Sequence, residues 1–266
     1  MLTDDQVARY LERIGAARPA RADHAALRDL QSRHVLSVPF ENIDFHLPVR
    51  VGITLEGAYD KVVPRRRGGG CWELNSLFAR LLTALGFQVH AVAGQPFDAG
   101  RMGPLMGHVS LRVKTVESEE TWLTDVGNGR GGARFPLRWD LAEPQSDPHG
   151  VYRLVPGPYG DRDLYKDGTA QFRFEERPRE FTDMVATVHW SQNAEESPFR
   201  RELMCFLPTE AGLITTDGRS LYRHESGSWS REPLGGTDSD VLTAYREHFG
   251  IELTEPPVLP DPGKHA

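Results

Sequence analysis

The stretch with the most reactive chemistry is residues 65–75, which read Arg-Arg-Arg-Gly-Gly-Gly-Cys-Trp-Glu-Leu-Asn. Glycines adopt backbone conformations that a side chain forbids, and a helical pattern begins directly behind Cys71. The thiol is therefore expected at a helix N-terminus, where unpaired N–H groups and the positive end of the helix dipole gather. That setting favours a thiolate, the nucleophilic form of cysteine. We interpret Cys71 as a candidate nucleophile, and the alternative is a small buried apolar residue.

A nucleophilic cysteine needs a base, and the chain offers one at the end of a strand. Residues 108–114 alternate between polar and apolar, which predicts a strand that begins at His108. Asp125 ends the next predicted strand, residues 121–126, directly before a glycine-rich loop. If the two strands pair in antiparallel fashion, the start of the first lies beside the end of the second. Cys71, His108 and Asp125 would then form a triad recognised by its roles, whereas the alternative for Asp125 is a turn former.

Helices are expected ahead of the cysteine and mostly strands behind it, because the apolar period changes after residue 86. Residues 1–86 are interpreted as a small helical bundle, and the short strands that follow indicate a sandwich or barrel. Residues 95–107, rich in glycine and proline, are predicted to form a loop. The predicted helices cover residues 3–14, 23–34, 55–62, 71–85 and 239–249, and the predicted strands cover residues 87–93, 108–114, 121–126, 151–154, 164–165, 171–174, 204–207, 213–216 and 220–223.

The composition predicts a soluble globular protein, with 39% hydrophobic and 26% charged residues. A net charge of −7 argues against a general nucleic-acid binder. Two cysteines in 266 residues do not form a disulfide framework, which indicates a reducing compartment. The chain starts without a signal-peptide pattern, and no apolar run approaches the ~20 residues of a membrane-spanning helix. We therefore expect a cytoplasmic protein with no nucleic-acid or membrane partner.

Metal and nucleotide sites are not expected from the motifs. Zinc sites require clustered cysteine and histidine, but Cys71 and Cys205 are isolated and no His-Glu-x-x-His occurs. The glycine loop ahead of Cys71 lacks the Lys-Ser or Lys-Thr ending of a P-loop, and residues 127–132 do not fit the dinucleotide spacing. Cys205 is interpreted as a core residue.

Several stretches, in order along the chain, resemble the arylamine N-acetyltransferase family. Residues 67–75, Arg-Gly-Gly-Gly-Cys-Trp-Glu-Leu-Asn, are similar to the active-site segment of that family, and residues 38–44, Val-Pro-Phe-Glu-Asn-Ile-Asp, to its N-terminal signature. His108 falls where the family's histidine opens its strand, and residues 125–129, Asp-Val-Gly-Asn-Gly, resemble the family's aspartate loop. The resemblance extends over the whole chain and is strongest up to about Gly131.

The resemblance implies an α+β fold in three parts, similar to that of cysteine proteases. Residues 1–86 would form a helical bundle that carries the nucleophile, residues 87–185 a central β-barrel that carries histidine and aspartate, and residues 186–266 an α/β lid. It also implies a two-step reaction without a metal. Cys71 would take an acetyl group from the co-substrate acetyl-CoA and pass it to an arylamine, hydrazine or arylhydroxylamine, with His108 as ion-pair partner and base and Asp125 orienting the imidazole.

Further site residues follow from position in the family. Gly129 would let the CoA pyrophosphate approach the backbone, and Phe40 and Phe199 would line the acceptor pocket. Asn128 stands where the family usually has phenylalanine, which implies a more polar pocket wall. The lid segment, residues 190–199, matches the family pattern only loosely apart from its Ser-Pro-Phe end.

Two alternatives stay open at this point. Asn128 and the loosely matching lid suit a related amide synthase, which closes a macrolactam from a carrier-bound polyketide with an aromatic amine, so that a carrier protein would be a partner. From a different class, the same fold could belong to a thiol hydrolase or a non-catalytic binding protein, because a fold does not determine a function.

Overall fold

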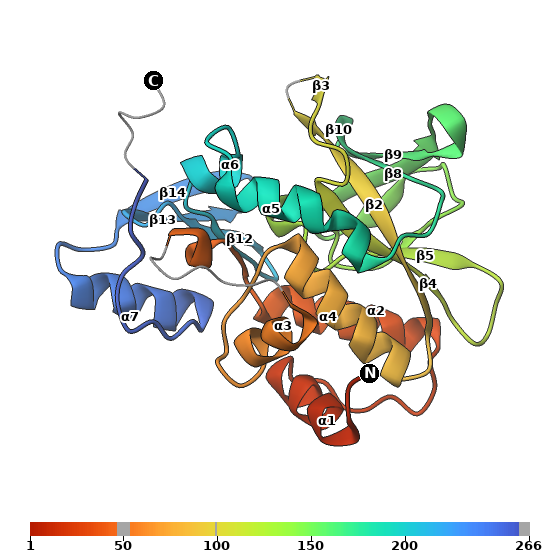
Figure 1. Cartoon of the computed structure of the whole chain (residues 1–266), viewed down its shortest axis with the longest axis horizontal. Coiled ribbons are helices and arrows are strands. Elements are labelled where there is room, and N and C mark those ends of the chain that lie inside the picture. Colours follow the sequence, from red (N-terminus) through yellow and green to blue (C-terminus); the bar gives the residue numbers. More distant parts are fainter. Residues whose placement is uncertain (47–53, 99, 261–266) are drawn as a thin grey trace.

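Helices come first in the computed structural model, which describes residues 1–46, 54–98 and 100–260. They lie together below the sheets in Figure 1, where α1 is the outermost of them. A short strand and a 3-10 helix separate α2 from α3. The elements of this part are α1 (Asp4–Arg13), α2 (His24–Ser37), β1 (Phe40–Glu41), η1 (Ile43–His46), α3 (Leu55–Val62) and α4 (Cys71–Ala84).

Side-chain caps set where the first two helices begin. The Thr3 hydroxyl accepts a hydrogen bond from the Gln6 backbone, and the Gln6 side chain accepts one from the Thr3 backbone, which together make a capping box. The Asp23 side chain caps α2 by accepting a hydrogen bond from the backbone N–H of Ala26, so α2 starts at His24. The helix continues to Ser37, three residues past the predicted end, and Pro39 prevents further extension.

Helix α4 forms the centre of the main hydrophobic core. Its buried face also contacts β2 and β4, so the helix joins the helical part to the neighbouring sheet. Each fully buried leucine or phenylalanine contributes roughly 1.5–3 kcal/mol to stability. The apolar α4 side chains with no exposed surface are Leu74, Leu77, Phe78, Leu81 and Leu82. The residue at the start of this helix, Cys71, is therefore held on a rigid support.

A curved antiparallel sheet follows and closes on itself as a central β-barrel. Its strand order is β6-β5-β4-β2-β10-β9-β8-β7, with β3 paired to β2. The two ends of this order are joined by a side chain, because Gln145 on β7 hydrogen-bonds to the backbone N–H and C=O of Arg138 on β6. The strands are β2 (Gln88–Asp98), β3 (Arg101–Met102), β4 (His108–Lys114), β5 (Thr121–Thr124), β6 (Leu137–Arg138), β7 (Gln145–Asp147), β8 (Gly150–Pro156), β9 (Arg162–Lys166) and β10 (Thr169–Phe174).

The prediction of a loop over residues 95–107 is partly wrong, because β2 continues through Pro96 as far as Asp98. Pairing between β2 and β4 ends at Gly94 opposite His108, whereas pairing with β10 continues to Pro96 opposite Phe172. Pro96, which has no N–H, thus stands where the strand has lost its β4 neighbour, a position that tolerates proline.

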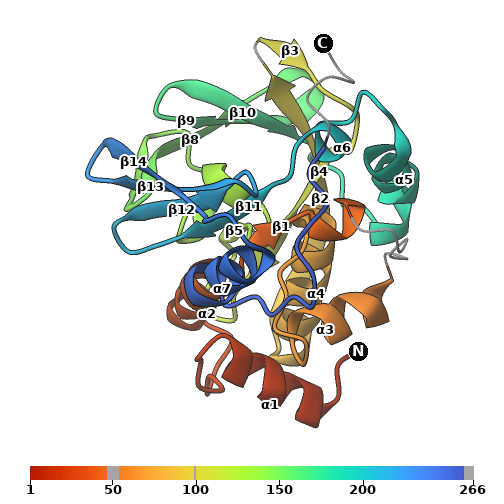
Figure 2. The same cartoon turned by 90° about the vertical axis from the view of Figure 1, so that its left-hand side faces the viewer.

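A second antiparallel sheet, in the order β1-β11-β12-β13-β14, forms the C-terminal part with α5, α6 and α7. Helix α7 covers one face of this sheet (Figure 2), and Tyr245 and Phe249 pack there against Leu221. The last strand, β14, was not predicted, because every residue in it is exposed and no apolar alternation marks it. The elements are α5 (Val185–Asn193), α6 (Pro198–Arg201), β11 (Cys205–Pro208), β12 (Gly212–Thr216), β13 (Ser220–Glu225), β14 (Ser228–Pro233) and α7 (Asp238–Phe249).

The N-terminal and C-terminal parts interlock through β1. Phe40 lies opposite Phe206 and Glu41 opposite Cys205, so residues from the helical part extend the C-terminal sheet. Helix α5 crosses above the start of α4 in Figure 1. Among the described residues, no helix is both long and apolar enough to cross a bilayer.

Candidate active site

Cys71 is the first residue of α4, as predicted, and its side chain is partly exposed to the neighbouring cleft. Gly70 caps the helix without a side-chain hydrogen bond. The loop after β5 packs directly on this helix start, because a Cβ on Gly127 would lie 2.6 Å from the Cys71 Cα. Glycine at that position therefore allows the aspartate-bearing loop to reach the cysteine.

His108 and Asp125 lie side by side, as the expected strand pairing requires. Strands β4 and β5 are antiparallel, with Leu111 opposite Thr124, so that prediction is confirmed. His108 Nε2 lies 2.6 Å from Asp125 Oδ2. Cys71 and His108 line the same cleft, and the Cys71 thiol contributes to raising the pKa of His108. Because Nε2 faces the carboxylate, Nδ1 is the nitrogen left for sulfur.

Two further side chains and a backbone amide hold the Asp125 carboxylate. Asn75 Nδ2 donates to Oδ1 at 2.9 Å, as does the backbone N–H of Gly127. The Ser110 hydroxyl donates to Oδ2 at 2.5 Å. Asn75 stands one helical turn after Cys71 and also donates to the carbonyl of Val109, the neighbour of His108. This one amide therefore connects the elements that carry the cysteine, the histidine and the aspartate.

The electrostatics favour an imidazolium–carboxylate pair. Burial alone lowers the pKa of His108, but the charge and hydrogen bond of Asp125, with smaller effects from Cys71, raise it to about 10. Burial acts to raise the pKa of Asp125, but the charge of His108 and hydrogen bonds from His108, Ser110 and Asn75 hold it below its usual range. The Phe172 ring stacks on the imidazole with centroids 4.3 Å apart, an arrangement that excludes water and favours a cation.

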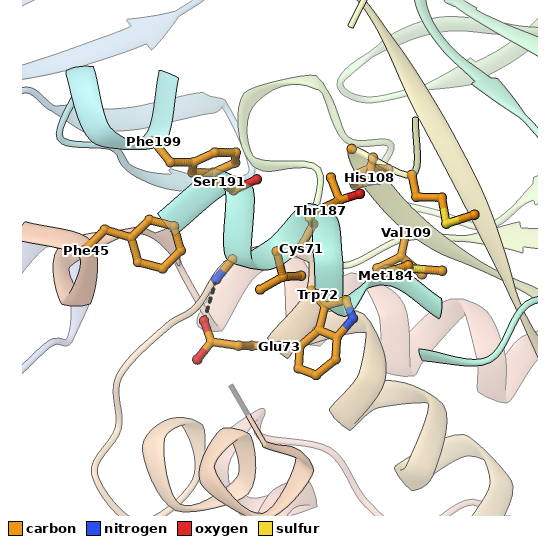
Figure 3. A pocket seen from close by; sticks show the side chains of 14 residues that line it. Phe45, Cys71, Trp72, Glu73, His108, Val109, Met184, Thr187, Ser191 and Phe199 are labelled. Atoms are coloured by element: carbon orange, nitrogen blue, oxygen red, sulfur yellow. Dashed lines mark hydrogen bonds between the residues drawn. The ribbon is translucent and has the colours of Figure 1, made fainter. Parts of the chain in front are cut away.

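Cys71 opens into an apolar cleft. Figure 3 shows Phe45 and Phe199 on one side of the thiol and His108 and Met184 on the other. Helix α5 crosses above it with the hydroxyls of Thr187 and Ser191. The other lining residues are Gly70, Trp72, Glu73, Met106, Gly107, Val109 and Val188. A cleft of this chemistry suits a flat apolar group placed next to the sulfur.

A buried ion cluster anchors the glycine loop from below. Lys61 Nζ lies 2.7 Å from Asp44 and 3.2 Å from Glu73, and Arg67 donates to Glu41 at 2.8 Å. Glu73 also accepts a hydrogen bond from the Gly70 backbone, the dashed line in Figure 3. Arg67 is thus a buried structural cation, and the loop ahead of Cys71 is fixed in place. The cluster consists of Glu41, Asp44, Lys61, Arg67 and Glu73.

The structure separates the remaining predicted residues. Phe199 lines the cleft with Cys71, whereas Phe40 and Asn128 border a second, small hollow that Asp125 also lines. The Phe40 ring reaches Phe199 with centroids 6.3 Å apart. Gly129 has φ +61°, and a Cβ there would lie 3.1 Å from a ring carbon of Phe206, so packing and backbone conformation already account for a glycine.

Within residues 1–46, 54–98 and 100–260, no group of three or more His, Cys, Asp or Glu side chains is arranged to hold a metal ion. Cys205 is buried in the C-terminal core with no exposed surface, as interpreted from the sequence.

Several residues of the site went unassigned in the sequence. Ser110 lies two residues after His108 and Asn75 four residues after Cys71, spacings that place each pair on one side of a strand or helix. The spacing of two in a strand and four in a helix could have identified Ser110 and Asn75. No such signal marks Thr187 and Val188, because α5 has no buried residue and no apolar periodicity.

Comparisons with known proteins agree with this geometry. The family model described as N-acetyltransferase matches residues 23–258. The arylamine N-acetyltransferase / N-hydroxyarylamine O-acetyltransferase of Salmonella typhimurium is 31% identical over 86% of this chain and 83% of its own length.

Solved structures agree as well. The M. smegmatis arylamine N-acetyltransferase matches with a TM-score of 0.85 and 30% identity, over 95% of this chain and 93% of the other. The Mycobacterium marinum arylamine N-acetyltransferase, solved in complex with CoA, matches with a TM-score of 0.83 and 28% identity over 92% of both chains. The expected three-part α+β fold is thereby confirmed.

Proposed function

The chain belongs to the arylamine N-acetyltransferase family and is an acyltransferase, and from this premise we propose that Cys71 carries the acetyl group as a thioester. The donor is acetyl-CoA, and the acceptor is an arylamine, hydrazine or arylhydroxylamine. The single observation that carries the proposal is the Cys71 thiol at a helix start, on the same cleft as an imidazole that Asp125 holds at 2.6 Å.

In the first step the Cys71 sulfur attacks the acetyl carbonyl carbon of acetyl-CoA. A carbon–sulfur bond to the protein forms, the bond to the CoA sulfur breaks, and the leaving thiolate takes a proton from the His108 imidazolium. In the second step the acceptor amine attacks the same carbon, the imidazole removes the amine proton, and Cys71 leaves as a thiolate. Asp125 keeps the charge on the imidazolium stable in both steps, which is why its four donors matter.

The cleft supports an aromatic acceptor, because Phe45, Phe199 and Met184 offer apolar faces next to the sulfur. That Phe40 and Asn128 shape the acceptor site remains a proposal, and both would act from behind this cleft. That the CoA pyrophosphate approaches Gly129 is also a proposal. It rests on the family position and on the CoA complex of the M. marinum relative. The division at residues 86 and 185 is proposed on the same family basis.

Acetyl transfer, rather than macrolactam closure, is proposed because the relatives reported above are named N-acetyltransferases. The decisive experiment is intact mass spectrometry after mixing with acetyl-CoA, followed by addition of an anilinic amine or hydrazine. One acetyl adduct on Cys71 that disappears when the amine is added is the expected result.

Cys205 provides the matched control within the same chain, because it is a second thiol that is fully buried. The variant C71A, which keeps Cys205, should form no adduct and release no CoA thiol. A folded wild-type protein that forms no adduct on Cys71, or CoA release that C71A retains, would refute the proposal and favour a hydrolase or binding protein.

A further inference from the structure

Ser110 occupies the junction between His108 and Asp125. The alternation of β4 places it two residues after His108 on the same side of the strand. Its side chain has no exposed surface. The hydroxyl oxygen lies 2.5 Å from Asp125 Oδ2 and 3.2 Å from His108 Nε2, so it contacts both members of the pair.

The single hydrogen of the Ser110 hydroxyl determines in which contact it donates and in which it accepts. A serine hydroxyl has one hydrogen and two lone pairs, and an ionised carboxylate can only accept. The hydroxyl therefore donates to Asp125, and its lone pairs face the Nε2–H of His108. Oδ1 of Asp125 is already held by Asn75 and Gly127, so Ser110 shares Oδ2 with the imidazole. Both contacts suit the charged forms of the pair.

We propose that Ser110 is a positioning residue that keeps His108 and Asp125 in the imidazolium–carboxylate state, and thereby keeps Cys71 reactive towards electrophiles at low pH. A donor to the carboxylate favours its ionised form, and an acceptor facing Nε2–H favours the protonated ring. An imidazolium beside Cys71 places a positive charge next to the sulfur, the setting in which reactive cysteines are found. The inference deepens the proposed function, because it concerns the same nucleophile.

A second buried hydroxyl nearby makes no hydrogen bond with the His108–Asp125 pair. Thr124, on the neighbouring strand directly before Asp125, has no exposed surface, and its Oγ1 has no hydrogen-bond partner among the described residues. Removing that hydroxyl should therefore leave the pair unchanged. T124V, which keeps the shape of the side chain, is the matched control for S110A.

The test is the pH dependence of Cys71 alkylation by iodoacetamide, with the adduct located by peptide mapping. This reaction needs no acetyl donor, so it stays informative even if acetyl transfer is not the function. In S110A the midpoint of the rate profile should move upward by about one pH unit, the size expected for one hydrogen bond to a charged group. S110C, with a weaker donor of similar size, should fall between S110A and wild type, and T124V should match wild type.

Three results would overturn the inference: an S110A profile that superimposes on wild type, a midpoint that moves downward, or a rate lowered equally at every pH, which indicates a structural role. If S110A does not fold, S110C decides by the same criteria. Failure of the proposed function would instead appear as a missing acetyl adduct with the order of the alkylation profiles intact.

Discussion

Replacing Asp125 by asparagine should invert the hydrogen-bond polarity at the centre of the site. All four groups on the carboxylate are donors in the present arrangement, from His108, Ser110, Asn75 and the Gly127 backbone. Of these, the Gly127 N–H cannot accept. The Asn75 oxygen already accepts from the backbone N–H of Val126. Only His108 and Ser110 can change roles.

The new amide in D125N must therefore turn its oxygen towards Asn75 and Gly127 and its NH₂ towards His108 and Ser110. Nε2 of His108 then has to accept, so the ring becomes neutral with its proton on Nδ1, the nitrogen that faces Cys71. An imidazole in that tautomer cannot take a proton from the thiol. The variant thus keeps the shape of the site but loses the base.

The magnitude follows from the pKa of His108, which lies at about 10 against an ordinary value of 6.5. The difference of about 3.5 pH units corresponds to about 5 kcal/mol of stabilisation of the imidazolium, an upper bound for its effect on the reaction. We expect acetylation of Cys71 in D125N to slow by about 100- to 10 000-fold at neutral pH, the range for loss of a positioned acid–base group.

Single-turnover release of CoA thiol, with the acetyl adduct followed by mass spectrometry, measures this effect. The control is D147N, because Asp147 also accepts backbone hydrogen bonds, from Arg134, Phe135 and His149, but does not contact the triad. D147N should keep the acetylation rate. A D125N rate within tenfold of wild type, in a folded protein, would refute this account of the site.

Two other perturbations test the support of the site. K61M removes the cation between Asp44 and Glu73 in the buried ion cluster and should lower the free energy of unfolding in urea by about 3–5 kcal/mol. K114M removes only the ion pair with exposed Glu119 and should leave the free energy of unfolding unchanged. Equal free energies of unfolding for K61M and K114M would contradict a stabilising role of the buried ion cluster. Burial and the nearby Arg13 lower the pKa of His34 to about 3. Between pH 6.5 and 3 the unfolded chain therefore binds a proton that the folded chain does not. As the pH is lowered through this range, the free energy of unfolding falls by about 1.4 kcal/mol per pH unit. H34Q, which can still bond Tyr10, should show a smaller drop in the free energy of unfolding between pH 6.5 and pH 5 than wild type. A drop equal to that of wild type would exclude His34 as its source.

Much of the fold could be predicted because its signals are local. The apolar face of α4 and the alternation of β4 depend on residues a few positions apart, and each was found where expected. Errors occurred where a neighbour decided the outcome. Pro96 stayed in a strand because β4 no longer pairs there, and exposed β14 formed because β13 offered an edge.

By itself, the sequence placed the candidate groups of the site: a thiol that opens a helix, a histidine that opens one strand and an aspartate that follows the next. Local periodicity is enough for that, because it decides on which element and which face each side chain stands. Only the tertiary structure decided what holds these groups. Ser110 and Asn75 became partners of Asp125, and Lys61 of Glu73, through contacts between residues up to 50 positions apart in the chain. Such contacts depend on strand order and helix packing, which leave no local period in the sequence.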